Sequence, residues 1–108
     1  MRVNANDILT HNSSLVNIIN KDIPMPYPVR SALTKNYKAL QAEVDIITKS
    51  VIDIRNMDIS EDEKKTKLSE LGNSEVELDI VKIQRDTLNI DGISAKDELS
   101  LEFMIEEE

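Results

Sequence analysis

A regular seam of apolar residues, inside a stretch free of glycine and proline, constrains the fold more than any other feature of the sequence. Its members are separated alternately by four and three residues, and they are Leu33, Tyr37, Leu40, Val44, Ile47, Val51 and Ile54. This spacing keeps all seven side chains on one side of an α-helix. It therefore predicts one uninterrupted helix over about residues 28–55, roughly 42 Å long at 1.5 Å per residue.

An apolar seam of this length must be covered, and two ways of covering it are open. It can pack on other helices of the same chain. It can also pair with another copy or with a partner, because three heptads approach the length of an independent coiled coil. Ile46 and Ile52 lie off the seam and widen the apolar face.

Two further helices are predicted, one on each side of the long helix. The first covers about residues 7–20, and a rigid connector with three prolines, residues 22–28, separates it from the long helix. After the long helix, Ser60 and Glu63 have the spacing of a capping box, which marks a helix start. We expect this third helix to end at Gly72, with that glycine as a left-handed cap.

Residues 75–80 alternate between acidic and apolar side chains, which is the strongest strand signal in the chain. One face carries Val76, Leu78 and Ile80, and the other carries Glu75, Glu77 and Asp79. A second short strand is predicted around Leu88 and Ile90, and residues 1–4 carry a weaker strand signal.

The C-terminal segment carries signals for a turn and a last helix. The turn is predicted at Asp91-Gly92, and the helix from Ser94 to about Met104. We expect this helix to bury Leu99, Phe103 and Met104. The predicted fold class is thus α+β, a single domain over residues 1–108. It is an α-hairpin dominated by the long helix, with a small antiparallel sheet from the C-terminal half that the N-terminal strand can join.

Charge is distributed unevenly along the chain. Residues 1–56 contain seven Lys/Arg and five Asp/Glu, whereas residues 57–108 contain six and sixteen, and the chain as a whole has a net charge of -8. The acidic half can simply confer solubility. It can also steer the protein toward a basic partner surface, including one that normally holds nucleic acid. The candidate partner-binding residues are Glu75, Glu77, Asp79, Glu106, Glu107 and Glu108.

Composition excludes several kinds of chemistry. The chain has no cysteine and one histidine, so it lacks a disulfide, a thiolate–metal site and a multi-histidine metal site. With only two glycines it has no phosphate-binding loop of the Walker or dinucleotide type. His11 lies in a polar stretch and is expected to be an exposed side chain rather than a general base. We therefore predict no enzyme activity, no cofactor and no metal.

Net charge and the length of the apolar runs also restrict the kind of partner that the chain can bind. An acidic chain is a poor binder of duplex nucleic acid, which requires basic surface, and no apolar run approaches the length of a membrane span. The expected partner is a protein, and the expected location is the cytoplasm, or a virion.

The acidic strand at Glu75–Ile80 and the ending Leu101-Glu-Phe-Met-Ile105, followed by acidic residues, resemble a family of small phage and prophage proteins of unknown function. The resemblance also includes the short N-terminal strand and helix, the connector with its prolines and the long helix. It implies a viral or prophage origin, and no activity or site residue.

Two functional hypotheses follow from these observations. In the first, the chain is a small acidic phage-type accessory protein that binds a host or viral protein and can inhibit it. In the second, it is a structural or assembly component of a phage particle that associates with itself through the helical seam.

Overall fold

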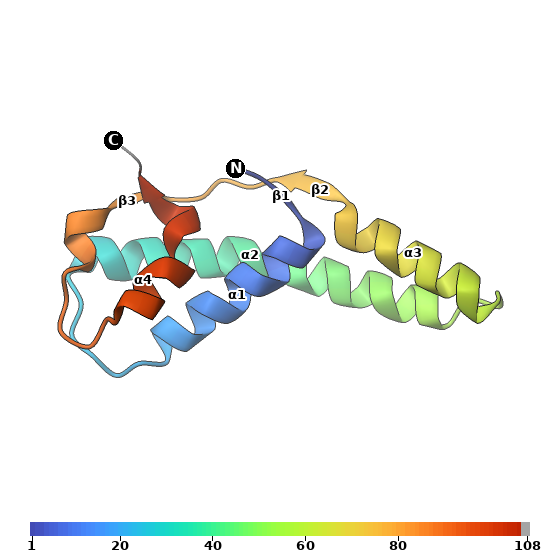
Figure 1. Ribbon diagram of the computed structural model, residues 1–108, viewed down its shortest axis with the longest axis horizontal. Coiled ribbons are helices and arrows are strands. Elements are labelled where there is room, and N and C mark those ends of the chain that lie inside the picture. The colour runs from blue at the N-terminus through green and yellow to red at the C-terminus, as the bar shows by residue number, and fades with distance from the viewer. Residues whose placement is uncertain (107–108) are drawn as a thin grey trace.

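A computed structural model describes residues 1–106 of the chain (Figure 1). The four α-helices of this part are α1 (Ala5–Ile19), α2 (Tyr27–Arg55), α3 (Glu61–Asn73) and α4 (Ala95–Ser100). Two 3-10 helices, η1 (Arg85–Leu88) and η2 (Glu102–Met104), precede and follow α4. The strands are β1 (Arg2–Asn4), β2 (Glu75–Glu77), β3 (Ile83–Gln84) and β4 (Ile105–Glu106). The fold is α+β, as predicted.

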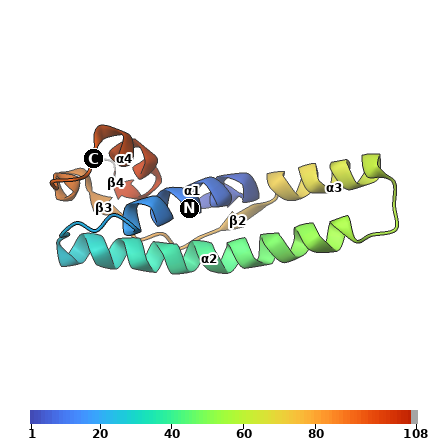
Figure 2. The same cartoon turned by 90° about the horizontal axis from the view of Figure 1, so that it is seen from below.

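Helix α2 is the spine of the molecule, which measures 51 × 29 × 21 Å. Its 29 residues confirm the uninterrupted helix that the seam predicts. Helix α1 lies along the first part of α2, and α3 lies along the second part, on the same side (Figure 2).

The seam is covered from within the chain. Four of its residues, Leu33, Leu40, Ile47 and Ile54, are buried, and the three that alternate with them, Tyr37, Val44 and Val51, are half-buried. The first of the two ways of covering the seam is therefore the one that the structure adopts. Ile46 and Ile52, off the seam, remain 59% and 52% exposed.

Side-chain caps start three of the helices. Asn4 accepts a hydrogen bond from the Asp7 amide at the start of α1, and Ser60 accepts one from the Glu63 amide at the start of α3. At α4 the capping box is complete, because Ser94 and Asp97 each accept from the other's backbone amide.

The predicted left-handed cap at Gly72 is wrong. Helix α3 continues to Asn73 and passes directly into β2 through Ser74, which is extended, so no left-handed residue is needed there. Gly72 instead allows a close approach to α1, since a Cβ atom at this position would lie 2.8 Å from the Asn6 amide nitrogen. Gly92, with φ of 98°, is the glycine that adopts the left-handed region, in the predicted turn.

The strands form two ladders of two strands each. Strand β1 pairs antiparallel with β2, with Val3 opposite Val76, so the N-terminal strand joins the acidic strand. Strand β3 pairs parallel with β4, with Ile83 opposite Ile105. The predicted strand 75–80 is shorter than expected, because β1 offers only three residues to pair with.

Beyond β2, a buried side chain takes the place of a partner strand. Asn36 of α2 accepts a hydrogen bond from the Val81 amide at 2.7 Å and donates one to the Val81 carbonyl at 2.9 Å. Asn36 is the fully buried polar residue of the core, and its amide nitrogen also lies 3.5 Å from the Met104 sulfur. This pairing fastens Val81, and with it the segment 78–82, to α2; we call it the Asn36 clamp.

Three predictions for the C-terminal region are wrong in detail. The expected strand at Leu88 and Ile90 is instead η1 and a turn, with Leu88 buried. The last helix ends at Ser100, and the chain tightens into η2. Met104 is buried as predicted, together with Leu101, and Phe103 is half-buried, but Leu99 is 69% exposed rather than buried.

Candidate protein-interaction surfaces

The predicted acidic face begins on β2, where part of its charge is already paired. Glu75 forms an ion pair with Arg2, and Glu77 lies 3.4 Å from the N-terminal ammonium group. That ammonium group also donates a hydrogen bond to the Leu78 carbonyl at 2.7 Å. Strand β1 therefore completes the ladder, and Arg2 and the Met1 ammonium group offset the charges of Glu75 and Glu77.

Asp79 is the carboxylate of this face that stays unpaired. It is exposed and takes part in none of the ion pairs within residues 1–106. Its neighbours are fixed on both sides, because Leu78 forms backbone hydrogen bonds with Met1 and Val81 forms two hydrogen bonds with Asn36.

Glu106 belongs to the second ladder. On β4 its carboxylate accepts a hydrogen bond from the Gln84 amide of β3 at 2.9 Å. The chain from β2 to β3 runs along one long edge of the molecule, with β4 beside β3 at its end (Figure 1). We call Glu75, Glu77, Asp79 and Glu106 on this edge the acidic edge. Glu107 and Glu108 lie outside the described residues.

A cluster of one arginine and two glutamates, which the sequence did not reveal, joins η1, α4 and η2. We call Arg85, Glu98 and Glu102 the arginine cluster. Arg85 of η1 donates to Glu98 at 2.6 Å and to both carboxylate oxygens of Glu102 at 2.9 and 3.0 Å. These hydrogen bonds, the one to Glu98 first, raise the pKa of Arg85 above its ordinary value. The partners are 13 and 17 residues away in sequence, so no helical spacing could have indicated them.

Next to this cluster, an ion pair joins α4 to the segment that follows α1. Lys21 lies 3.1 Å from the Asp97 carboxylate. The pKa of Asp97 is lowered, mainly because its carboxylate accepts a hydrogen bond from the Ser94 amide and secondarily through Lys21. A groove of about 390 Å³ between η1 and α4 has Leu88, Ile90 and Ile93 among its lining residues. Arg85 lies on this groove, but Glu98 and Glu102 already satisfy its guanidinium group.

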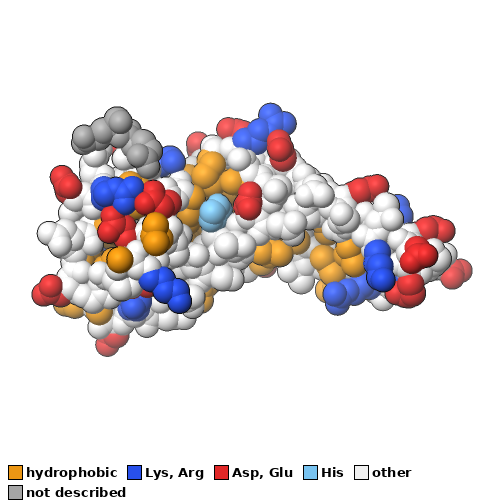
Figure 3. Space-filling model, viewed as in Figure 1, with side chains coloured by type: hydrophobic (Ala, Val, Ile, Leu, Met, Phe, Trp, Pro, Cys, Tyr) orange, Lys and Arg blue, Asp and Glu red, His pale blue; other side chains and the backbone are white. Residues whose placement is uncertain are grey.

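His11 is half-buried, contrary to the exposed position predicted for it. Its ring stacks on Phe103 with the ring centroids 4.1 Å apart and the planes inclined by 19°. Figure 3 shows the histidine beside exposed hydrophobic atoms. Burial lowers the pKa of His11, and nearby Asp7 acts in the opposite direction. Within residues 1–106 neither ring nitrogen of His11 forms a hydrogen bond. The stacking of His11 on Phe103 instead holds the C-terminal segment against α1.

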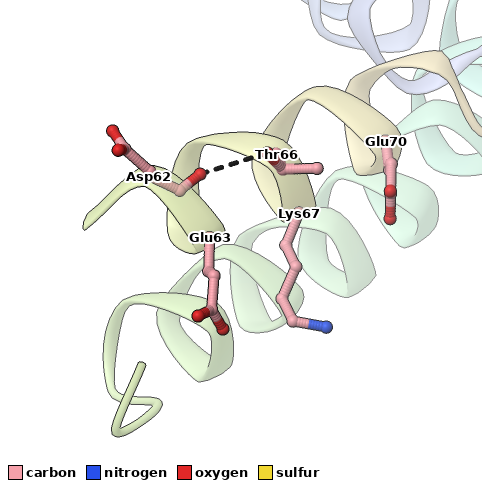
Figure 4. Close-up of a pocket in the computed structure, with 5 residues that line it drawn as sticks. All are labelled: Asp62, Glu63, Thr66, Lys67 and Glu70. Atoms are coloured by element: carbon pink, nitrogen blue, oxygen red, sulfur yellow. Dashed lines mark hydrogen bonds between the residues drawn. The ribbon is translucent and has the colours of Figure 1, made fainter. Parts of the chain in front are cut away.

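A groove of about 300 Å³ follows the surface of α3 (Figure 4). Its lining residues are Asp62, Glu63, Thr66, Lys67 and Glu70. All come from one helix, and the Thr66 hydroxyl donates to the Asp62 carbonyl at 3.1 Å. These five residues are all exposed, so this groove is a solvated helix surface. In the part of the chain that the structure describes, no three carboxylate or histidine groups are placed to hold a metal ion.

Comparison with known proteins adds no relative. No protein-family model, no curated protein and no solved structure matches the chain. Among the helices of residues 1–106, none is long and apolar enough to cross a membrane.

Proposed function

We propose that this chain is a non-enzymatic protein-binding module that docks its acidic edge on a basic surface of a partner protein. The observation that carries the proposal is the unpaired Asp79, presented with Glu75, Glu77 and Glu106 along one ordered edge of a chain with a net charge of -8. Charges arranged in this way increase the rate of encounter with a basic partner and select against acidic ones.

The resemblance to small phage and prophage proteins supports a more specific form of this proposal. In it, the chain is a phage-type accessory protein whose partner is a host or viral protein. Docking on a basic surface inhibits the partner when that surface is also the one that binds an anionic ligand.

The helical seam offers less support for a role in particle assembly. Four of its seven residues are buried under α1, α3 and the C-terminal segment, so the seam is not a free surface of the folded chain. Self-association through the seam would require these elements to separate from α2.

A charge-reversal experiment tests the proposal. The variant E75K/E77K/D79K is compared with the wild type in capture of proteins from bacterial lysate at increasing NaCl concentrations. The matched control is D53K/D58K/E70K, which changes net charge equally at exposed positions away from the acidic edge. We expect capture by the wild type and the control to fall steeply with salt, and capture by the edge variant to be lost. Capture that is indifferent to the edge substitutions in a variant with native circular dichroism would refute the proposal.

A further inference from the structure

A small apolar groove opens where α1, α2, α3 and β2 meet. Its volume is about 90 Å³. Ile8 and Ile47 are among its buried lining residues, Leu71 and Val76 are half-buried, and Ile46 is the most exposed apolar one. The remaining lining residues are Ala5, Glu43, Ser50 and Ser74.

The size of this groove restricts what it can hold. Pockets for cofactors and drug-sized ligands measure about 300–1,000 Å³. An apolar cavity of about 150 Å³ holds one benzene molecule. A groove of about 90 Å³ lined mainly by apolar side chains is thus matched to one aliphatic side chain.

Glu43 gives the groove its polarity. It is the carboxylate among the lining residues, it is half-buried, and it forms no hydrogen bond or ion pair within residues 1–106. A carboxylate that is partly removed from water is stabilised by a nearby cation. The groove therefore favours an apolar side chain that arrives with a positive charge beside it.

Strand β2 connects this groove to the acidic edge. Val76 lines the groove, whereas its neighbours Glu75 and Glu77 project from the opposite face of the strand, because successive strand residues alternate. The groove and the carboxylates of Glu75 and Glu77 thus lie on opposite faces of the same three-residue strand.

Charge and area both argue against a second copy of this chain as the occupant. The net charge of -8 makes two copies repel each other. A stable dimer also needs about 800 Å² of buried surface on each partner, far more than a site for one side chain provides. An anionic lipid surface is disfavoured by the same charge.

We propose that the groove binds one aliphatic side chain of a partner segment in which lysine or arginine flanks that side chain. This inference rests on the proposed function, since it specifies the kind of basic segment that the partner contributes. It assigns Ile46 to the contact with the aliphatic side chain and Glu43 to the contact with the flanking cation.

The test uses a defined probe and methyl NMR of the full chain labelled at isoleucine. The probe is a short peptide with one leucine between lysines, and the comparison peptides replace leucine by serine or the lysines by glutamates. We expect saturable shifts of the Ile8, Ile46 and Ile47 methyl signals with the lysine–leucine peptide alone. Equal shifts with the serine peptide, or shifts confined to other isoleucines, would overturn the proposal.

Matched variants sharpen the test. Ile46→Asp is expected to weaken binding at least about tenfold. Ile52→Asp, at a similarly exposed position of α2 that does not line the groove, is expected to leave binding unchanged. Glu43→Gln is expected to weaken binding several-fold and to reduce its salt dependence. Equal losses in the two aspartate variants would contradict the assignment, and a dimer that Ile46→Asp dissociates would assign the groove to a second copy.

The two proposals fail in distinguishable ways. If E75K/E77K/D79K loses partner capture from lysate while Ile46→Asp retains it and the probe leaves the groove signals unmoved, the acidic edge stands and the groove assignment is wrong. If the probe binds the groove but the edge variant captures partners normally, the proposed function is wrong and groove binding is a separate property.

Discussion

Replacing Asn36 by alanine is expected to destabilise the protein by about 2–3 kcal/mol. The substitution removes both hydrogen bonds to Val81, each contributing about 1 kcal/mol, and leaves backbone polar groups without partners at a further cost of about 1–3 kcal/mol. Val81 is itself exposed, so water can hydrogen-bond to its backbone groups in the variant, and the lower part of the range of about 1–3 kcal/mol applies. The higher helix propensity of alanine returns up to about 0.7 kcal/mol.

An exposed asparagine on a neighbouring helix gives the control. Asn17 of α1 is exposed and forms no side-chain hydrogen bond within residues 1–106, so Asn17→Ala should change only helix propensity. It is expected to stabilise the protein by up to about 0.7 kcal/mol, opposite in sign to Asn36→Ala.

Urea unfolding followed by circular dichroism measures both values, and hydrogen exchange of the Val81 amide reports the local effect. A loss of less than about 0.5 kcal/mol for Asn36→Ala, with Val81 exchange unchanged, would refute the clamp.

Three further predictions concern the turn, the histidine and the arginine cluster. Gly92→Ala should lower stability by about 1–2 kcal/mol in urea unfolding, because alanine is strained at φ of 98° and its Cβ would lie 2.9 Å from Ile23; an unchanged midpoint would contradict this. Burial lowers the pKa of His11 in the folded state, so its contribution to stability is complete above the unfolded-state pKa of about 6.5 and is lost as pH falls through that value. The free energy of unfolding in urea should therefore decrease more for the wild type than for His11→Phe between about pH 7.5 and 5.5. Arg85→Gln should lower the thermal midpoint at low salt, with a smaller difference in high salt, and a salt-independent difference would show that packing and not charge is responsible.

The sequence predicted the parts of the fold that depend on local periodicity. The seam from Leu33 to Ile54 specifies α2 because its period matches one helix face, and the capping residues Ser60 and Ser94 mark real helix starts. The alternation at residues 75–80 placed Glu75 and Glu77 correctly on one face of a strand.

Features that depend on distant contacts could not be predicted in this way. Strand β2 stops early because its partner β1 is short, and β1 lies more than 70 residues away. Leu99 is exposed because it lies on the side of α4 opposite to the buried Leu101, and only the packing of the folded chain decides which side faces the core. At the candidate surfaces, the pairing of Glu75 with Arg2 and the grouping of Glu43 with Ile8 and Val76 likewise arise only once the chain is folded.

The placement of the groove follows from how unevenly α2 is covered. Its first half packs against α1 and against the segment 78–82 that Asn36 fastens. Its second half packs against α3, a helix with no buried residue. Because α3 has no buried side chain, the second half of α2 is covered less extensively than the first half. The groove lies where the two halves meet, with Ile8 from one side and Leu71 from the other. A partner side chain that fills the groove therefore contacts residues from both halves of the molecule, and its binding energy depends on the packing of α3 as well as on that of α1.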